Sequence, residues 1–412
     1  MNLLNKLKKP LKSLAIGIGL SLATIPAYTQ NRSINFEKEN FENIKKTAKN
    51  TNKLIFVDGY AIWCSPCKEM DKNVFTNDSV ADFYNQNFIN LKMDMESDSG
   101  KILKKEYNIE AYPTFLYLDG EGKLLHKKAG GMKSPEFIEL GKEALNPETQ
   151  LATFNEKYEK GNRDSEFIYE YLKKLEQAHI DYKNISKDYF KTQKEENFTS
   201  KINWNILFIN ERKTDIDSKT FNYLIKNKIK FDKIYTADSV DEKIFNAYFY
   251  NFINISREKS FNDSIYNIWK DKVKQSGFSE TNEILLEADL QYNEKMKNWD
   301  AYASNAVLLA GTKRYDNAKK LDNLAWTFLK NIKNKNHLEK ALNWAEHSIK
   351  LSDKMYNNDT YASLLYVLGD TAKAIQIEEK AIKLAKEIGS NEKAIAWLDK
   401  KLQKMKDGEK LD

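Results

Sequence analysis

The sequence predicts an α/β domain followed by an all-α region of helical repeats. Between residues 30 and 147, short apolar segments bounded by turn residues alternate with amphipathic segments, as in a domain that packs helices against a sheet. Beyond residue 147, Gly and Pro become scarce. Apolar residues such as Tyr171, Leu172 and Leu175 recur there at spacings of three and four, which is typical of amphipathic helices.

The N-terminal segment 1–29 differs from the rest of the chain. Four lysines precede a mostly apolar run over residues 14–27, and the first acidic residue is Glu37. This layout is typical of a cleaved signal peptide, so we expect a periplasmic or secreted protein. The alternative is a retained membrane anchor, but Gly17, Gly19 and Pro26 interrupt the run, which is short for a bilayer span of about 20 residues.

Length and charge limit the classes of function. The 412 residues, of which 41% are hydrophobic and 31% charged, are enough for two or three domains with substantial cores. Loss of the segment 1–29, with its four lysines and no acid, lowers the formal net charge from +6 to +2. Nucleic acid is therefore not an expected partner.

The elements of the α/β domain, at residues 30–147, can be placed in order. The apolar segment 53–59 is typical of a buried strand, and it leads directly to two cysteines. A helix over 67–75 follows, with Met70, Val74 and Phe75 on one side. The other expected elements are a strand at 88–95, a helix at 101–107, a strand at 114–118, a turn at 119–122, a hairpin strand at 123–126 and a last helix from Ser134.

Cys64 and Cys67 are the only cysteines in the chain. As a structural disulfide they would add little stability, because closing so small a loop removes little entropy from the unfolded chain. A zinc site is not expected, because the only other candidate Cys or His ligands are four histidines scattered along the chain. A c-type haem is not expected either, because it needs a His immediately after the second cysteine, where Lys68 stands. A redox pair fits this spacing better than a structural disulfide does. If a helix begins at Cys64, the positive end of its dipole stabilises the Cys64 thiolate.

The order of motifs carries a resemblance to a known family. A buried strand, the string Trp-Cys-Ser-Pro-Cys-Lys at 63–68, a strand, a helix, and Tyr-Pro-Thr at 112–114 before a hairpin follow one another. This order resembles the thioredoxin superfamily over residues 36–146, about a quarter of the chain. The resemblance implies a thioredoxin-like fold and a protein-disulfide oxidoreductase, with the redox-active disulfide as its only cofactor and no metal.

The resemblance also implies roles for single residues. Cys64 would be the exposed nucleophile and Cys67 the thiol that resolves the mixed disulfide. Asp58, six residues before Cys64, matches the buried acid of the family. Because burial raises the pKa of a carboxyl group, Asp58 could take the proton from Cys67 near neutral pH. The alternative is a turn or cap residue before Gly59.

Three further residues are implied to bind the substrate. Pro113 matches the cis-proline of the family, which presents backbone groups to a substrate strand; the alternative is a trans proline that opens an edge strand. Tyr112 precedes it, as in protein disulfide isomerase domains, and would shape substrate choice. Trp63 matches the aromatic residue that packs beside the cysteines and helps to exclude water.

Ser65 and Pro66, between the cysteines, are expected to tune the redox potential. Because no His stands there to stabilise the thiolate, we expect a reducing or interchange role, with a net oxidase or isomerase as the alternative. Lys92 resembles the lysine that approaches the buried acid of the family, or is a solvated strand-edge lysine. The expected partners are exported proteins with disulfides and a membrane or soluble redox partner.

The rest of the chain is expected to be a helical region at 148–300 and tetratricopeptide-like repeats at 301–412. Ala341, Trp344 and Ser348 recur at one constant offset as Ala374, Ile377 and Ala381, and this offset is close to the tetratricopeptide period of about 34 residues. Helical repeats form a concave surface that could hold a protein partner. A second class of function is therefore a binding scaffold in which the cysteine pair is not catalytic.

Overall fold

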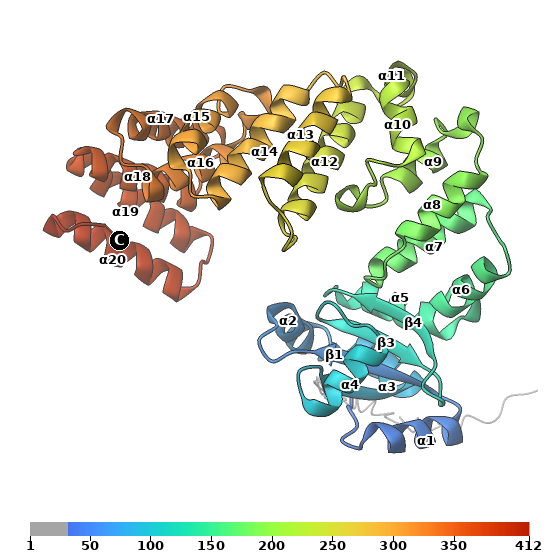
Figure 1. Ribbon diagram of the computed structural model, residues 1–412. Helices are drawn as coiled ribbons and strands as arrows, with labels where there is room; N and C mark the ends of the chain where they lie inside the picture. The colour runs from blue at the N-terminus through green and yellow to red at the C-terminus, as the bar shows by residue number, and fades with distance from the viewer. Residues whose placement is uncertain (1–31, 412) are drawn as a thin grey trace, which may run out of the picture. The chain divides into compact units, whose positions relative to one another are not determined.

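The computed structural model describes residues 32–411, so the predicted signal peptide lies outside the described residues. The chain forms two compact units: one extends to Glu156 and includes Gln177–His179, and the other contains Lys157–Glu176 and the chain from Ile180 onward. All the strands of Figure 1 belong to the first unit. Within the described chain, no helix combines the length and the apolar character needed to cross a membrane.

The first unit is built on a mixed sheet of four strands with the order β2-β1-β3-β4. β1 pairs in parallel with β2 and antiparallel with β3, which pairs antiparallel with β4. The predicted strand at 114–118 is confirmed, whereas the one at 123–126 was placed too short, because its pairing with β3 continues to Ala129. The strands are β1 (Leu54–Tyr60), β2 (Phe88–Asp94), β3 (Thr114–Leu118) and β4 (Leu124–Ala129).

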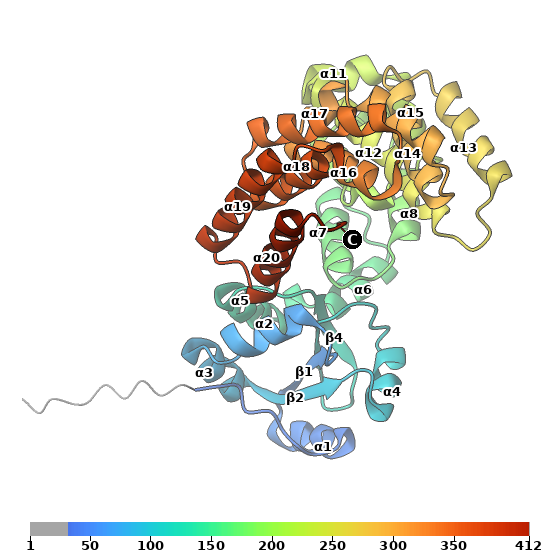
Figure 2. The ribbon, with the colours of Figure 1, turned by 90° about the vertical axis from the view of Figure 1, so that its left-hand side faces the viewer.

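Helices cover both faces of this sheet, as the views in Figures 1 and 2 show. Phe56 and Phe115 point to one face, and Ile55 and Leu116 point to the other, as the alternation of a strand requires. The first face packs against α2 (Ser65–Asn73), α3 (Asp78–Asn87) and α5 (Ser134–Leu145), and the second against α1 (Phe41–Thr51) and α4 (Asp98–Glu106).

N-cap side chains set where four of these helices begin: α1, α2, α3 and α4. α2 begins two residues before the predicted start at Cys67, because Cys64 caps it and Pro66 fits its first turn. α4 begins at Asp98 instead of 101, because the Ser97 side chain accepts a hydrogen bond from the backbone N–H of Gly100. α1 and α3, which had not been predicted, are capped in the same way by Asn40 and Asn77.

Aromatic rings fill the core on the α2 face. Phe56 is fully buried and its ring centre lies 4.9–6.4 Å from those of six other aromatic residues. The rings of Tyr84 and Phe137 stack with their centres 4.4 Å apart, and the Tyr84 hydroxyl donates to the Phe137 carbonyl at 2.8 Å. This cluster holds α3 and α5 on the strand that leads to the cysteines.

The second unit is all-helical where the structure describes it, as predicted. Two helix pairs fall where repeats were expected: α16 with α17, and α18 with α19. Gly369, with φ of 101°, ends α18, and Asp370 caps α19. Ala374 and Ala381 are fully buried. The assignment of these two helix pairs as tetratricopeptide repeats stays a prediction, as do the domain limits that the sequence predicted.

The remaining helices follow in chain order. They are α6 (Leu151–Glu159), α7 (Ser165–Gln177), α8 (Lys183–Thr192), α9 (Lys201–Leu207), α10 (Lys219–Lys226), α11 (Lys228–Tyr235), α12 (Ala237–Ser256), α13 (Asp263–Gln275), α14 (Thr281–Lys295), α15 (Trp299–Leu309), α16 (Ala318–Asn331), α17 (Lys335–Leu351), α18 (Met355–Leu368), α19 (Thr371–Glu387) and α20 (Glu392–Asp407). Short 3₁₀ turns connect several of them: Pro147–Thr149, Glu195–Asn197, Glu211–Lys213 and Lys313–Tyr315.

The aromatic cluster gives a test of the core. Phe56→Ala removes a fully buried ring and leaves a cavity, so the free energy of unfolding of the first unit should fall by about 3–5 kcal/mol. Hydrogen exchange of β1 and β3 amides in the full chain measures this change. Ile102→Ala, at a side chain in α4 that is 69% exposed, should change it by less than about 1 kcal/mol. Equal losses in the two variants would contradict the assigned core.

Candidate active site

Cys64 and Cys67 form a disulfide at the N-terminus of α2, with an S–S distance of 2.07 Å. Cys64 is the N-cap residue, and its Sγ accepts a hydrogen bond from the Cys67 backbone N–H at 3.1 Å. The first turn of α2 contains no acidic residue. The positive end of the helix dipole therefore acts on the Cys64 sulfur without a competing negative charge in that turn, which favours a thiolate there after reduction.

Both cysteines are buried, each with an exposed fraction of 3%. The expectation that Cys64 is the exposed cysteine is therefore wrong for the disulfide form. The cause is the packing around the pair: both residues lie in one cluster with Ala61, Tyr60 and Tyr112. An attacking thiolate can reach either sulfur only where this packing leaves a small opening.

Asp58 lies inside β1, with an exposed fraction of 1%, and is not a turn or cap residue. One carboxylate oxygen, Oδ2, lies 3.4 Å from the Lys92 ammonium, and the other, Oδ1, has no hydrogen-bond partner among residues 32–411. Burial raises the pKa of Asp58 from 3.8 to about 7, although the charge of Lys92 opposes the shift. Near neutral pH this carboxyl group can therefore both hold and release a proton.

Gly59 follows Asp58 because the site has no room for a side chain. A Cβ at this position would lie 2.8 Å from the Met95 methyl carbon and 3.0 Å from the Thr114 carbonyl oxygen. Thr114 is the partner of Gly59 in the β1–β3 register and immediately follows Pro113. The glycine thus lets the strand with the acid pass close to the loop with the proline.

Lys92 is paired with Asp58 in the register of β1 and β2. Its ammonium also contacts the carboxylate of Asp71 in α2 and lies 4.8 Å from the centre of the Tyr60 ring. The side chain is only 23% exposed, so a fully solvated strand-edge lysine is the wrong description even though β2 is an edge strand. Lys92 therefore connects the buried acid to the helix that carries the cysteines.

The Tyr112–Pro113 peptide bond is cis, as the resemblance implied. The Pro113 carbonyl accepts a hydrogen bond from the Gly130 N–H at 2.8 Å, and the Thr114 hydroxyl donates to the Ala111 carbonyl at 2.7 Å. No hydrogen bond from the part of the chain that the structure describes reaches the backbone N–H or C=O of Tyr112. These two groups, beside the disulfide, are free to pair with an extended segment of another protein.

Trp63 and Tyr112 form an aromatic wall next to the disulfide. Their rings meet edge to face with centres 5.8 Å apart. The Trp63 indole N–H donates to the Glu96 carboxylate at 2.8 Å, and the Lys104 ammonium donates to the Tyr112 hydroxyl at 2.7 Å. Trp63 is 67% exposed, so it does not seal the cysteines from water as the resemblance implied.

A groove of about 640 Å³ runs along the other side of the α2 N-terminus. Ser65 and Pro66 line it together with Met70, and residues 131–134 form the opposite wall. The two residues between the cysteines therefore face open space, where a substrate chain can contact them.

The structure brings together most of the residues singled out in the sequence, but three partners were missed. Asp71, Glu96 and Lys104 come from α2, the turn after β2, and α4. Only Asp71 had a signal, because it stands one helical turn after Cys67. Within residues 32–411, no group of three or more His, Cys, Asp or Glu side chains could hold a metal ion.

The raised pKa of Asp58 predicts how stability depends on pH. Between pH 4 and 7 the folded chain keeps a proton on Asp58 that the unfolded chain releases, so the free energy of unfolding falls as pH rises. Asp58→Asn should remove this fall in the free energy of unfolding, which is on the order of 3 kcal/mol between pH 5 and pH 8. Urea unfolding of the oxidised protein at both pH values measures it. Asp98→Asn, at an exposed side chain, should retain the wild-type pH dependence.

A second prediction concerns Asp71. Its negative charge raises the pKa of Asp58, and it shares the ammonium of Lys92. Asp71→Asn should therefore move the midpoint of the Asp58 titration to lower pH, which carboxyl-detected NMR can follow. Glu69→Gln is the matched control in α2, because Glu69 is exposed and pairs with Asn73. An unchanged midpoint in Asp71→Asn would contradict the coupling of these three residues.

Comparisons with known proteins give the same assignment for this part of the chain. Residues 41–145 match the thioredoxin-like domain family. The chain is 33% identical over 86 residues to Thioredoxin H-type of Brassica campestris, covering 21% of this chain and 65% of that protein. It is 31% identical over 103 residues to Thiol:disulfide interchange protein DsbD of Haemophilus influenzae, covering 23% of this chain and 18% of that protein.

A solved structure of a putative disulphide-isomerase from Bacteroides thetaiotaomicron is also similar. It is 38% identical, with coverage of 28% of this chain and 97% of that chain and a TM-score of 0.27. The chain spans less than two thirds of the curated thioredoxin and less than a fifth of DsbD. Residues 41–145 are therefore a thioredoxin-like domain, similar in sequence to thioredoxins and to thiol:disulfide interchange proteins.

Proposed function

We propose that this protein is an exported thiol–disulfide oxidoreductase that reduces or exchanges disulfides in exported proteins. The observation that carries the proposal is the Cys64–Cys67 disulfide on the N-terminus of α2, in a domain whose sheet also buries Asp58. Export rests on the four lysines and the apolar run within the segment 1–29, which are typical of a protein sent to the periplasm or out of the cell.

The first step starts from the dithiol form. The Cys64 thiolate, stabilised by the N-terminus of α2, attacks one sulfur of a substrate disulfide. A bond forms between Cys64 Sγ and that sulfur, the substrate S–S bond breaks, and the other substrate sulfur leaves as a thiolate. The product is a mixed disulfide that keeps the substrate covalently bound.

The second step releases the substrate. Cys67 loses its proton to the Asp58 carboxylate and attacks Cys64 Sγ, which breaks the mixed disulfide and expels the second substrate thiolate. Two electrons have then passed to the substrate, and the Cys64–Cys67 disulfide has formed. A pKa of about 7 suits Asp58 to this task, because the group is part carboxylate and part acid near neutral pH.

The substrate chain is proposed to bind beside the cis-proline. The unpaired backbone groups of Tyr112 can form main-chain hydrogen bonds with an extended segment, while Trp63 offers an apolar face. Pro113 holds Tyr112 in place through its carbonyl bond to Gly130. Ser65 and Pro66 tune the redox potential through the first turn of α2 and contact the bound chain.

Electrons must come from another protein, because the sequence contains no third cysteine. The proposed direction is reduction or interchange, since no His stands between the cysteines to stabilise the Cys64 thiolate. A measured reduction potential close to that of thioredoxin, which is about −270 mV, would support this direction. A value about 100 mV or more higher makes the protein a net oxidase or isomerase instead.

The roles of the two cysteines can be tested by trapping. In the full chain, Cys67→Ser should accumulate covalent complexes with exported proteins, because Cys64 attacks and nothing resolves the mixed disulfide. Cys64→Ser is the matched control and should trap none. Non-reducing electrophoresis of thiol-blocked extracts, followed by mass spectrometry, measures both. Equal trapping by the two variants would refute the assignment.

The same variants distinguish catalysis from a binding scaffold. An active enzyme reduces insulin disulfides when a reductant is present, and Cys64→Ser abolishes this activity. A scaffold on the helical repeats would instead retain its partner in both cysteine variants, without a covalent bond. Loss of Cys64 with no effect on insulin reduction would favour the scaffold.

A further inference from the structure

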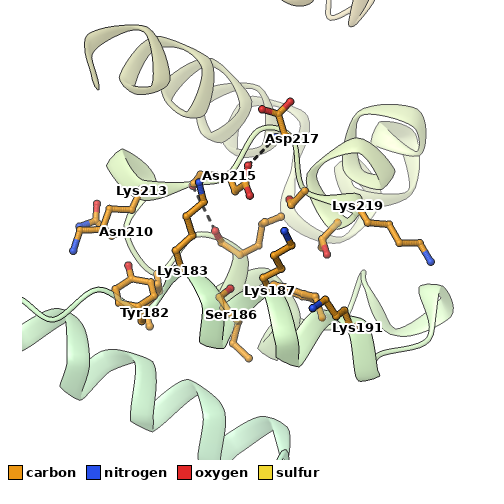
Figure 3. Close-up of a pocket in the computed structure, with 17 residues that line it drawn as sticks. Tyr182, Lys183, Ser186, Lys187, Lys191, Asn210, Lys213, Asp215, Asp217 and Lys219 are labelled. Carbon is orange, nitrogen blue, oxygen red and sulfur yellow. Dashed lines mark hydrogen bonds between the residues drawn. The ribbon is translucent and has the colours of Figure 1, made fainter. Parts of the chain in front are cut away.

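The second unit contains a cavity of about 350 Å³, shown in Figure 3. α8 forms one side, the end of α9 and the loop after it form another, and the start of α10 closes it. Its volume lies at the small end of the range of ligand pockets, enough for a ligand of about a dozen heavy atoms. None of its residues belongs to the redox site.

The inner wall of this cavity is apolar. Phe190 from α8 and the segment with Ile206, Leu207 and Ile209 contribute aromatic and aliphatic surface. Phe190 and Ile206 are themselves buried, so their packing fixes the wall. Such a wall favours a ligand with a hydrocarbon body, because the ligand gains by leaving water.

The rim of the cavity carries positive charge that is not neutralised. Figure 3 shows the side chains of Lys183 and Lys187 rising from α8 toward the segment with Asp215 and Asp217. Among the described residues, neither lysine forms an ion pair or a side-chain hydrogen bond. The other rim lysines are paired: Lys191 with Asp188, Lys213 with Glu176 and Lys219 with Glu195.

The two acidic residues of the lining have partners of their own. Asp217 forms an ion pair with Lys272. The Asp215 carboxylate accepts a hydrogen bond from the Asp217 N–H at 3.0 Å. A backbone N–H does not neutralise the Asp215 carboxylate, so the rim holds two unpaired lysines and one acid without an ion pair. The net positive charge that remains suits an anionic group.

The first turn of α10 adds polar groups to the wall of the cavity. Thr220, in the first turn of α10, is 1% exposed, and its Oγ1 has no hydrogen-bond partner in the described chain. This hydroxyl group has no surface open to the cavity, so it does not contact a ligand there. The first turn of α10 also has unpaired N–H groups that favour an anion.

We propose that this cavity binds a small amphipathic carboxylate, with its head group between Lys183 and Lys187 and its hydrocarbon body against Phe190 and Ile206. Two independent features of one cavity support this ligand class: the apolar wall and the two unpaired lysines. Ligand binding at this site does not depend on the cysteine chemistry, so it can be tested independently of the redox function.

The test uses sodium decanoate, below its micellar concentration, as the ligand in calorimetric titrations of the full chain. Decanoate should bind with a stoichiometry of one. Lys183→Gln/Lys187→Gln should weaken this binding at least about tenfold, because both charged contacts are lost. Lys335→Gln/Lys400→Gln, a matched pair of lysines that do not line the cavity, should leave it unchanged.

Two further ligands test the contributions of the head group and of the hydrocarbon tail separately. Acetate has the head group alone, and decyltrimethylammonium has the tail with the opposite charge, so both should bind at least about tenfold more weakly than decanoate. No decanoate binding, equal binding of the cationic analogue, or equal affinity in Lys183→Gln/Lys187→Gln would overturn the proposal.

Discussion

The electrostatics of the candidate site depend on one buried carboxyl group, that of Asp58 within β1. Its burial raises its pKa to about 7, and the only charge that opposes this shift directly, Lys92, is also bound by Asp71. Without Asp71, the lysine could fully serve as the counterion of Asp58 and keep it ionised. Sharing one ammonium between two carboxylates leaves the buried group able to exchange a proton near neutral pH. The proposed transfer of a proton from Cys67 to Asp58 uses this property.

Elements with sharp boundaries in the sequence could be predicted well. β3 was placed correctly because Pro113 precedes it and an Asp-Gly turn follows it. α2 was placed two residues late because its N-cap is a cysteine, which the usual capping preferences do not include. α1 and α3 begin after asparagines, and in a chain so rich in Asn this signal does not stand out.

For the site, the motif residues could be predicted from the sequence but their neighbours could not. Cys64, Asp58 and Pro113 follow from motifs that resemble those of the thioredoxin superfamily. Glu96 and Lys104 reach Trp63 and Tyr112 only because the sheet brings their segments together. The exposure of the cysteines was also wrong for this reason, since it is set by the packing of Tyr60 and Tyr112. The cavity in the second unit had no sequence signal at all, because lysines at four-residue spacing also occur on solvated helix faces.

The burial of both sulfurs constrains how this protein can choose partners. Each cysteine residue is only 3% exposed, so the groups that surround the disulfide, which include the aromatic wall of Trp63 and Tyr112, limit how a partner can approach it. Ile62 and Trp63 are 70% and 67% exposed, so two large apolar side chains stand in water beside the disulfide. Covering them gives a partner binding energy that a small thiol cannot obtain. The same packing that hides the sulfurs therefore favours exchange with a docked protein over exchange with free thiols.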